Sequence, residues 1–184
     1  GNDILDVAAS VQGQTSKTNF FGGDGNDILR GVAIGNGGLG DDRIETAVVG
    51  FTYNTYNNNS NKSPSSPLVR VAGGAGNDTL IASTIAADIA GGSGNDTITG
   101  SSADDVIYGD GFDSVGVIVD QGNGGLADRT FVGWGAASTS DGADIISAGA
   151  GNDWVDAGWN DDTVDGGTGN NTIYGGGGSD TITT

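Results

Sequence analysis

The sequence predicts an all-β fold in which short strands and glycine-rich turns wind into a flattened, stacked spiral. Three observations predict it: a nine-residue motif recurs along the chain, an aliphatic residue stands at its eighth position every time, and 37 of the 184 residues are glycine. A period of nine matches neither a helix nor a simple strand, but it matches a six-residue turn followed by a three-residue strand. We therefore expect a β-solenoid with strand-like insertions.

The repeats fall into four blocks. Residues 1–6 hold the back half of one copy, 22–45 two copies, 73–108 four and 139–183 five in tandem. Each strand should pair with its equivalent two repeats further on, so that two nonapeptides make one coil and coils must stack to bury a narrow core. The eighth-position residues of that core are Leu29, Ile44, Leu80, Ile89, Ile98, Ile107, Ile146, Val155, Val164, Ile173 and Ile182.

Three insertions, 7–21, 46–72 and 109–138, interrupt the repeats within one domain that spans residues 1–184. The second has two alternating ends around an Asn/Ser/Pro tip, which predicts a protruding hairpin. The third contains VGVIVD and RTFVGW, which are strand-like. The apolar content of the insertions either caps or flanks the spiral, or forms a contact surface for a partner. The same two interpretations apply to the aromatic residues Phe112, Phe131, Trp134, Trp154, Trp159 and Tyr174.

The acidic residues are nearly all of one kind. Asp and Glu number 24 against 6 Lys and Arg, for a net charge of −18, and Glu45 is the one glutamate. A generic solvated surface would mix the two acids, so a short, turn-compatible carboxylate is preferred here. This charge excludes nucleic acid as a partner, because phosphate binding needs clustered basic residues. It would also repel itself in a compact fold unless cations were bound.

Aspartate at the sixth position of the motif predicts a metal site. Sixth-position aspartates eighteen residues apart would stack at about 4.8 Å, one strand spacing. A calcium ion between them, completed by backbone carbonyls next to the glycines, would remove their repulsion, since Ca²⁺ prefers six to eight oxygen ligands. The pairs predicted in this way are Asp78 with Asp96, Asp144 with Asp162, and Asp162 with Asp180.

Three other positions predict weaker or conditional sites. Asp153 faces Asn171, so one charge is lost, and Asp105 faces Ala87, so a site there requires help from Asp88. Asp27 and Asp42 pair only if residues 31–36 act as a shortened opposite turn. The complete set of predicted calcium ligands, for several ions, is Asp27, Asp42, Asp78, Asp96, Asp105, Asp144, Asp153, Asp162 and Asp180.

Repeats such as GGSGNDTIT and GGAGNDTLI resemble the calcium-binding nonapeptide GGxGxDxUx of the RTX (repeats-in-toxin) family. The resemblance covers eleven nonapeptides and one partial copy. It implies a parallel β-roll, a right-handed β-solenoid, in a bacterial protein that is secreted by type I machinery to the extracellular space or cell surface and folds there on calcium. Residues 82–90 and the turn of Asn171 depart from the motif, so the resemblance assigns no calcium ligand to them.

Other functional classes find little support in the sequence. Without histidine there is no HExxH and no ordinary serine triad, and the aspartates that could pair for glycoside cleavage are accounted for by turns, so we predict no enzyme in this segment. GNGGLG matches GxGxxG but overlaps a calcium repeat, and no EF-hand loop is present. Cysteine is absent, and no apolar run reaches the length of a membrane span. Because the chain opens in mid-repeat, we expect a piece of a longer polypeptide.

The function we predict is that of a calcium-binding extracellular structural or adhesive protein, such as a surface layer, filament or adhesin, with end-to-end self-association through shared calcium. The alternative is the C-terminal module of a secreted hydrolase or toxin, and an upstream catalytic domain would decide for it. Ice binding would need an unbroken outward row of threonines, which Trp154 and Asp165 interrupt. A metal-free solenoid would leave the aspartate pairs unexplained.

Overall fold

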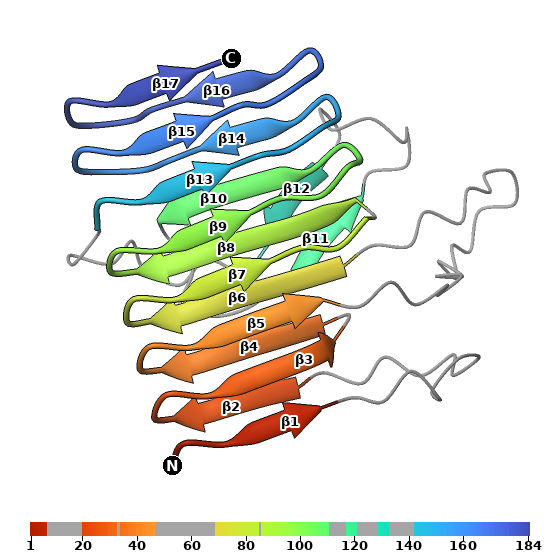
Figure 1. Cartoon of the computed structure of the whole chain (residues 1–184), viewed down its shortest axis with the longest axis vertical. Helices are drawn as coiled ribbons and strands as arrows, with labels where there is room; N and C mark the ends of the chain where they lie inside the picture. Colours follow the sequence, from red (N-terminus) through yellow and green to blue (C-terminus); the bar gives the residue numbers. More distant parts are fainter. Residues whose placement is uncertain are drawn as a thin grey trace, which may run out of the picture.

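In the computed structural model, the described residues are 1–6, 20–32, 34–46, 69–84, 86–110, 117–120, 129–132 and 142–184. Within them the chain alternates between two parallel sheets that face each other (Figure 1). The described residues contain no helix, and hence none that is long and apolar enough to cross a membrane. The predicted all-β fold, a parallel β-roll, is confirmed.

One sheet has eight strands, most of them of the predicted length of three residues. The order of its strands in space follows their order in the sequence, also on the two sides of each insertion. Its strands, in spatial order, are β1 (Ile4–Asp6), β3 (Ile28–Val32), β5 (Arg43–Thr46), β7 (Thr79–Ile81), β9 (Thr97–Thr99), β13 (Ile145–Ser147), β15 (Thr163–Asp165) and β17 (Thr181–Thr183).

The other sheet has seven strands, and five of them are longer than three residues. In β2, β4, β6, β8 and β10 the pairing continues past the aliphatic residue into the start of the next repeat, because the opening glycines of stacked repeats also pair in register, as Gly38, Gly74 and Gly92 do. The strands are β2 (Phe20–Asp24), β4 (Ile34–Leu39), β6 (Val69–Ala75), β8 (Ala87–Ser93), β10 (Val106–Asp110), β14 (Trp154–Asp156) and β16 (Thr172–Tyr174).

Glycine is required in these paired turns. Gly74 has φ +120°, and a Cβ built on it would lie 2.1 Å from the carbonyl oxygen of Gly38 in the coil below. Stacked coils therefore approach backbone to backbone, with no room for a side chain between them. This close approach explains why the motif keeps its glycines.

The register confirms that two repeats make one coil. Leu80 pairs with Ile98, and Ile146 pairs with Val164, in each case eighteen residues further on. The coil that joins β3 to β5 is shorter, because β3 and β4 are separated by a single residue and Leu29 pairs with Ile44, fifteen residues further on. The eighth-position residues point inward from both sheets, and from Leu29 to Val164 they are at most 2% exposed, whereas Ile182 is 43% exposed.

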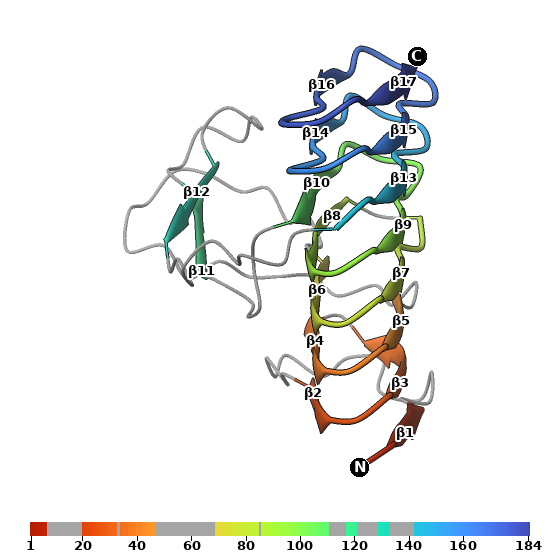
Figure 2. The same cartoon turned by 90° about the vertical axis from the view of Figure 1, so that its left-hand side faces the viewer.

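The insertion between β10 and β13 contributes a separate two-stranded sheet. β11 (Val117–Asp120) and β12 (Arg129–Val132) pair antiparallel, which confirms that VGVIVD and RTFVGW contain strands. They lie beside the roll, on the side of the seven-stranded sheet (Figure 2). The predicted hairpin tip within 46–72 lies outside the described residues, as do Phe112 and Trp134.

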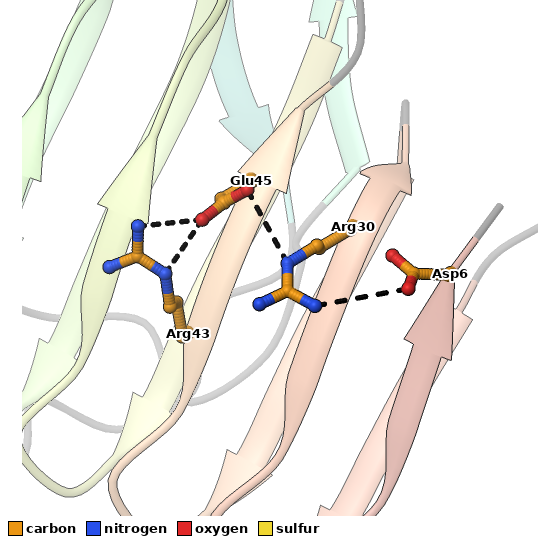
Figure 3. Close-up of polar contacts among 4 residues, drawn as sticks. All are labelled: Asp6, Arg30, Arg43 and Glu45. Atoms are coloured by element: carbon orange, nitrogen blue, oxygen red, sulfur yellow. Dashed lines mark hydrogen bonds and ion pairs between the residues drawn. The ribbon is translucent and has the colours of Figure 1, made fainter. Parts of the chain in front are cut away.

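The outer face of the eight-stranded sheet carries a row of ion pairs across β1, β3 and β5 (Figure 3). The guanidinium of Arg30 lies 3.8 Å from a carboxylate oxygen of Asp6 and 3.6 Å from one of Glu45, and Arg43 lies 2.6 Å from Glu45. The one glutamate of the chain thus serves in a surface ion pair and not in a turn. Such exposed pairs contribute about 0–1 kcal/mol each, so they are a minor source of stability.

Candidate metal centres in the turns

The sixth-position aspartates form two rows, one along each edge of the roll. The aspartates of the first row precede strands of the eight-stranded sheet, and those of the second precede strands of the seven-stranded sheet. All the predicted ligands except Asp180 are buried, at 3% exposure or less, whereas Asp3, the sixth-position aspartate of the partial first copy, is exposed. The first row is Asp27, Asp42, Asp78, Asp96, Asp144, Asp162 and Asp180; the second is Asp105 and Asp153, in line with Ala87 and Asn171.

One oxygen of each carboxylate holds the next coil by a backbone hydrogen bond. The N–H of Asp78 donates to Oδ1 of Asp96 at 2.8 Å, and the N–H of Asp144 donates to Oδ1 of Asp162 at 2.9 Å. Asp162 donates to Asp180 in the same way, at 3.1 Å. The structure therefore brings together the three pairs that the eighteen-residue spacing predicts.

The conditional pairs are also brought together. The N–H of Asp27 donates to Oδ1 of Asp42 at 2.7 Å, because the short crossing between β3 and β4 keeps the two turns stacked. The N–H of Asp153 donates to Oδ1 of Asn171 at 2.9 Å. Both rows are thus continuous through the positions where the motif is shortened or altered.

The structure adds pairs that the spacing did not predict, each across an insertion. The N–H of Asp42 donates to Asp78 at 2.6 Å, that of Asp96 to Asp144 at 2.8 Å, and that of Asp105 to Asp153 at 2.9 Å. Counting residues cannot find these pairs, because the partners are 36 or 48 positions apart. They could have been found by leaving the insertions out of the count, because the repeats keep their order on the two sides of each insertion.

The second carboxylate oxygen of most of these aspartates has no hydrogen-bond partner. Oδ2 of Asp96 lies 2.2 Å from the point where a Cβ on Gly91 would stand, and the carbonyl oxygen of Gly109, one coil on, lies 2.4 Å from the same point. Gly22, Gly37 and Gly73 show the same arrangement. The buried, unpartnered Oδ2 atoms include those of Asp27, Asp42, Asp78, Asp96, Asp153 and Asp162.

Two acceptor oxygens that face one small space repel each other and are stabilised by a cation or a hydrogen-bond donor between them. Calcium takes oxygen ligands at about 2.3–2.6 Å, from carboxylates and backbone carbonyls alike. In the described part of the chain, no three Asp, Glu, His or Cys side chains converge on a point, so a metal here depends on carbonyls as well. An all-oxygen donor set of this kind suits calcium or magnesium and not zinc.

Asn171 shows what happens where the carboxylate is replaced by an amide. Its Nδ2 donates a hydrogen bond to the carbonyl oxygen of Gly166, the first residue of its own turn, at 2.5 Å. The amide therefore supplies a proton to a glycine carbonyl of the turn, which a carboxylate cannot do. By contrast, the Oδ2 atoms of Asp78 and Asp96 have no hydrogen-bond partner.

Asp105 differs from the other aspartates. Its Oδ2 accepts the N–H of Ser101 at 2.5 Å, and its Oδ1 accepts both the Ser101 hydroxyl at 2.9 Å and the N–H of Ala87 at 2.8 Å. Both oxygens are thus engaged within the protein. Asp88 lies in β8 next to the inward-facing Ile89, so its side chain is on the outer face of the sheet and not in this turn.

Burial makes the ionised rows unfavourable in the absence of a cation. Burial, followed by the charge of neighbouring aspartates, raises the pKa of Asp42 to about 6, that of Asp78 to about 7 and that of Asp96 to about 8. Hydrogen bonds from the stacked backbone oppose this rise but do not cancel it. The turns therefore favour bound positive charge, either protons or a metal ion.

A parallel β-roll with paired aspartates and exposed carbonyls in glycine turns defines a class of calcium-binding repeat proteins. The family model of the RTX calcium-binding nonapeptide repeat (4 copies) matches residues 19–33, 70–84, 88–115, 138–173 and 157–184, more than half of the chain. The chain therefore belongs to the RTX calcium-binding repeat family. The repeats of this family are structural and bind calcium, and its members are typically secreted by bacteria. Neither a curated protein nor a solved structure matches the chain.

Proposed function

We propose that the sixth-position aspartates are this chain's calcium ligands, each acting with the glycine carbonyls of its own and the neighbouring coil. The observation that carries this proposal is the row of buried Oδ2 atoms without a hydrogen-bond partner; those of Asp27, Asp42, Asp78 and Asp96 each face a carbonyl across the space left by a glycine. Asp105 is the weakest member of the set, because Ser101 already satisfies it.

Calcium binding itself is tested by equilibrium dialysis of the whole chain. We expect several ions per chain at millimolar calcium, in the range of extracellular calcium modules. A double variant, Asp78→Asn with Asp96→Asn, should lose part of the bound calcium, whereas Asp6→Asn on the outer face should lose none. The absence of bound calcium at millimolar concentration would overturn the proposal.

We further propose that the protein has a structural or adhesive role outside the cell. The support is a row of aromatic side chains on the outer face of the seven-stranded sheet, Tyr108, Trp154 and Tyr174, with ring centroids 4.9 Å and 5.7 Å apart. Tyr174 is 54% exposed and Trp159, in a nearby turn, 64% exposed. Exposed apolar groups of this size are typical of contact surfaces. Replacing Trp159 and Tyr174 by Ser should reduce retention on cell surfaces without changing calcium binding; unchanged retention would contradict the role.

End-to-end self-association is part of the same proposal. β1 and β2 stand at one end of the two sheets and β16 and β17 at the other, so the outer edge of each can pair with a further coil. The charge of −18 opposes side-by-side contact, and shared calcium would offset it at the ends. We expect the intensity of scattered light to rise as calcium is added and to fall back to its starting value when calcium is chelated. A monodisperse monomer at millimolar calcium would contradict this.

The alternative function is that of an export and folding module joined to a secreted hydrolase or toxin. It relies on the same calcium-binding repeats, and it predicts that the aromatic row contacts the neighbouring domain. In that case the Ser variants of Trp159 and Tyr174 should impair the parent enzyme and leave surface retention unchanged.

A further inference from the structure

One turn of the first aspartate row is split by an insertion. The chain leaves the roll after Gly109 and Asp110, the last residues of β10, and is described again from Gly142, two residues before Asp144. Oδ2 of Asp144 lies 2.2 Å from the point where a Cβ on Gly109 would stand, just as Asp96 relates to Gly91. Gly109 thus takes the first position in the turn of Asp144, the position that the nine-residue period assigns to Thr139.

Asp110 takes the second position of this split turn, where the neighbouring coil has Gly92. Its Oδ1 accepts the N–H of Gly142 at 3.1 Å, and its Oδ2 accepts the N–H of Trp159, in the next coil, at 2.6 Å. Asp110 is 8% exposed. The side chain therefore joins the place where the chain leaves the roll to the place where it returns.

In uninterrupted turns, backbone carbonyls accept the equivalent N–H groups. The fourth-position N–H of Gly76 donates to the carbonyl of Ser93 at 2.8 Å, and the third-position N–H of Gly177 donates to that of Gly158 at 2.8 Å. In the split turn the single carboxylate of Asp110 accepts both kinds of bond. It therefore completes the turn and, in doing so, adds a negative charge that no other turn of this row has at its second position.

The surroundings of the split turn indicate a cation. Oδ2 of Asp96, whose residue is 1% exposed, has no hydrogen-bond partner and faces the carbonyl of Gly109. Asp110 also lies close enough to Asp96 and Asp162, on the coils to either side, for its charge to raise the pKa of both carboxyls after the effect of burial. The split turn thus contains two carboxylates, those of Asp110 and Asp144, where the other turns of this row have one at these two positions.

We propose that the split turn, formed by Gly109, Asp110, Gly142 and Asp144, is a distinct cation site with two carboxylates, and that it binds calcium more tightly than the uninterrupted turns. This inference rests on the proposed calcium function and adds a second carboxylate, Asp110, outside the sixth position. Both oxygens of Asp110 accept backbone N–H groups, so it acts on the ion through its charge and not as a direct ligand. The physical reason is that a second negative charge beside a buried site strengthens the attraction for Ca²⁺. The bound ion holds both ends of the insertion against the roll.

The test uses terbium as a probe, because Tb³⁺ takes the same ligands as Ca²⁺ but gains more from each added charge. Trp159 donates its N–H to Asp110 and can sensitise Tb³⁺ luminescence. Because Trp159 also belongs to the turn of Asp162, the signal that is lost in Trp159→Phe but kept in Asp162→Asn is assigned to the split turn. Affinities for Tb³⁺, and for Ca²⁺ by competition, are measured in the whole chain, in Asp110→Asn, and in the control Asp165→Asn. Asp165 also accepts one backbone N–H, from Gly167 at 3.0 Å, but lies in a strand.

We expect Asp110→Asn to weaken Ca²⁺ at the Trp159-reported site by roughly tenfold, in line with the loss of a supporting group at a metal site, and to weaken Tb³⁺ by more. Asp165→Asn should change neither. Unchanged affinities in Asp110→Asn would overturn the proposal, and so would equal losses for both ions, which would show that Asp110 acts through its hydrogen bonds alone. If the unaltered chain binds no calcium at all, the proposed function itself fails.

Discussion

At the scale of the residue, most turn aspartates divide two tasks between their two oxygens, and Asp105 is an exception. Oδ1 accepts a backbone N–H from the neighbouring coil, as in the 2.8 Å bond from Asp78 to Asp96, and Oδ2 faces a carbonyl without a hydrogen-bond partner. The first contact stacks the coils, and the second makes the stack dependent on a cation. Asparagine can perform the first task but not the second, as Asn171 shows.

The difference between Asp162 and Asp105 gives a prediction. Asp162→Ala should weaken calcium-dependent folding more than Asp105→Ala, because Asp162 accepts from Asp144, donates to Asp180 and keeps an unpartnered Oδ2. Both oxygens of Asp105 are already satisfied by Ser101 and Ala87. Calcium titrations of the two variants give the midpoints, and equal shifts would count against the stacked pairing.

The raised pKa values predict how the calcium-free protein responds to pH. In the folded state the pKa of Asp78 is about 7 and that of Asp96 about 8, against an ordinary value of 3.8, because burial disfavours their charge. The folded state therefore binds protons more tightly than the unfolded state, so its stability is fully present below about pH 4 and is lost as pH rises through about 8.

Circular dichroism of calcium-free protein should accordingly show more β structure at about pH 5 than at about pH 8. Calcium should reverse the order, since metal and protons compete for the same oxygens. Asp78→Asn with Asp96→Asn serves as the control, because it removes the two most strongly perturbed of these groups. More β structure at the higher pH without calcium would contradict the proposed cause.

At the scale of the element, each three-residue strand of the roll points one residue toward the core. Ile98 in β9 is 1% exposed, whereas its neighbours Thr97 and Thr99 point outward. Ile98→Ala should lower the free energy of unfolding by about 2–5 kcal/mol, since it leaves a cavity between two sheets with no space to collapse further. Thr97→Ala should change it by less than about 0.5 kcal/mol. Urea unfolding at saturating calcium measures both, and similar effects would contradict this core.

The elements that follow the nine-residue period could be predicted from sequence, and those that depart from it could not. Leu80 and Ile98 identify their strands and their pairing by spacing alone. Val69 and Val71 are buried in β6, at 1% and 2% exposure, although they stand at the end of the 46–72 insertion. Their alternation was visible, but the coil they join is defined by contacts with β4 and β8, which no local period contains.

The residues of the candidate site can likewise be divided into those that the sequence predicts and those that it does not. Turn position predicts which carboxylates stack, because stacking follows from the coil length. Two other contacts could not be predicted, because they depend on which groups meet in three dimensions. They are the hydrogen bond from Ser101 to Asp105 and the hydrogen bond from Gly142 to Asp110 that closes the split turn. A serine in place of a glycine is a visible departure from the motif, but its hydrogen-bond partner is set by the fold.

At the scale of the whole molecule, the roll keeps one continuous register while long insertions leave and rejoin it. Ile44 pairs with Leu80 and Ile98 with Ile146, each across an insertion. The coils on the two sides of an insertion are therefore held by the same backbone and aspartate contacts as the tandem coils. With a net charge of −18, this stack is opposed by its own repulsion, which bound cations would reduce.

The measurement that tests this account most directly is far-UV circular dichroism of the whole chain across a calcium titration. Because the buried aspartate rows oppose folding without a cation, we predict a largely disordered spectrum in excess chelator at neutral pH and a cooperative gain of β structure as calcium rises to millimolar concentration. Magnesium at the same concentration serves as the control for ionic strength and should produce less β structure. A folded β spectrum that is unchanged between excess chelator and millimolar calcium would contradict the central claim.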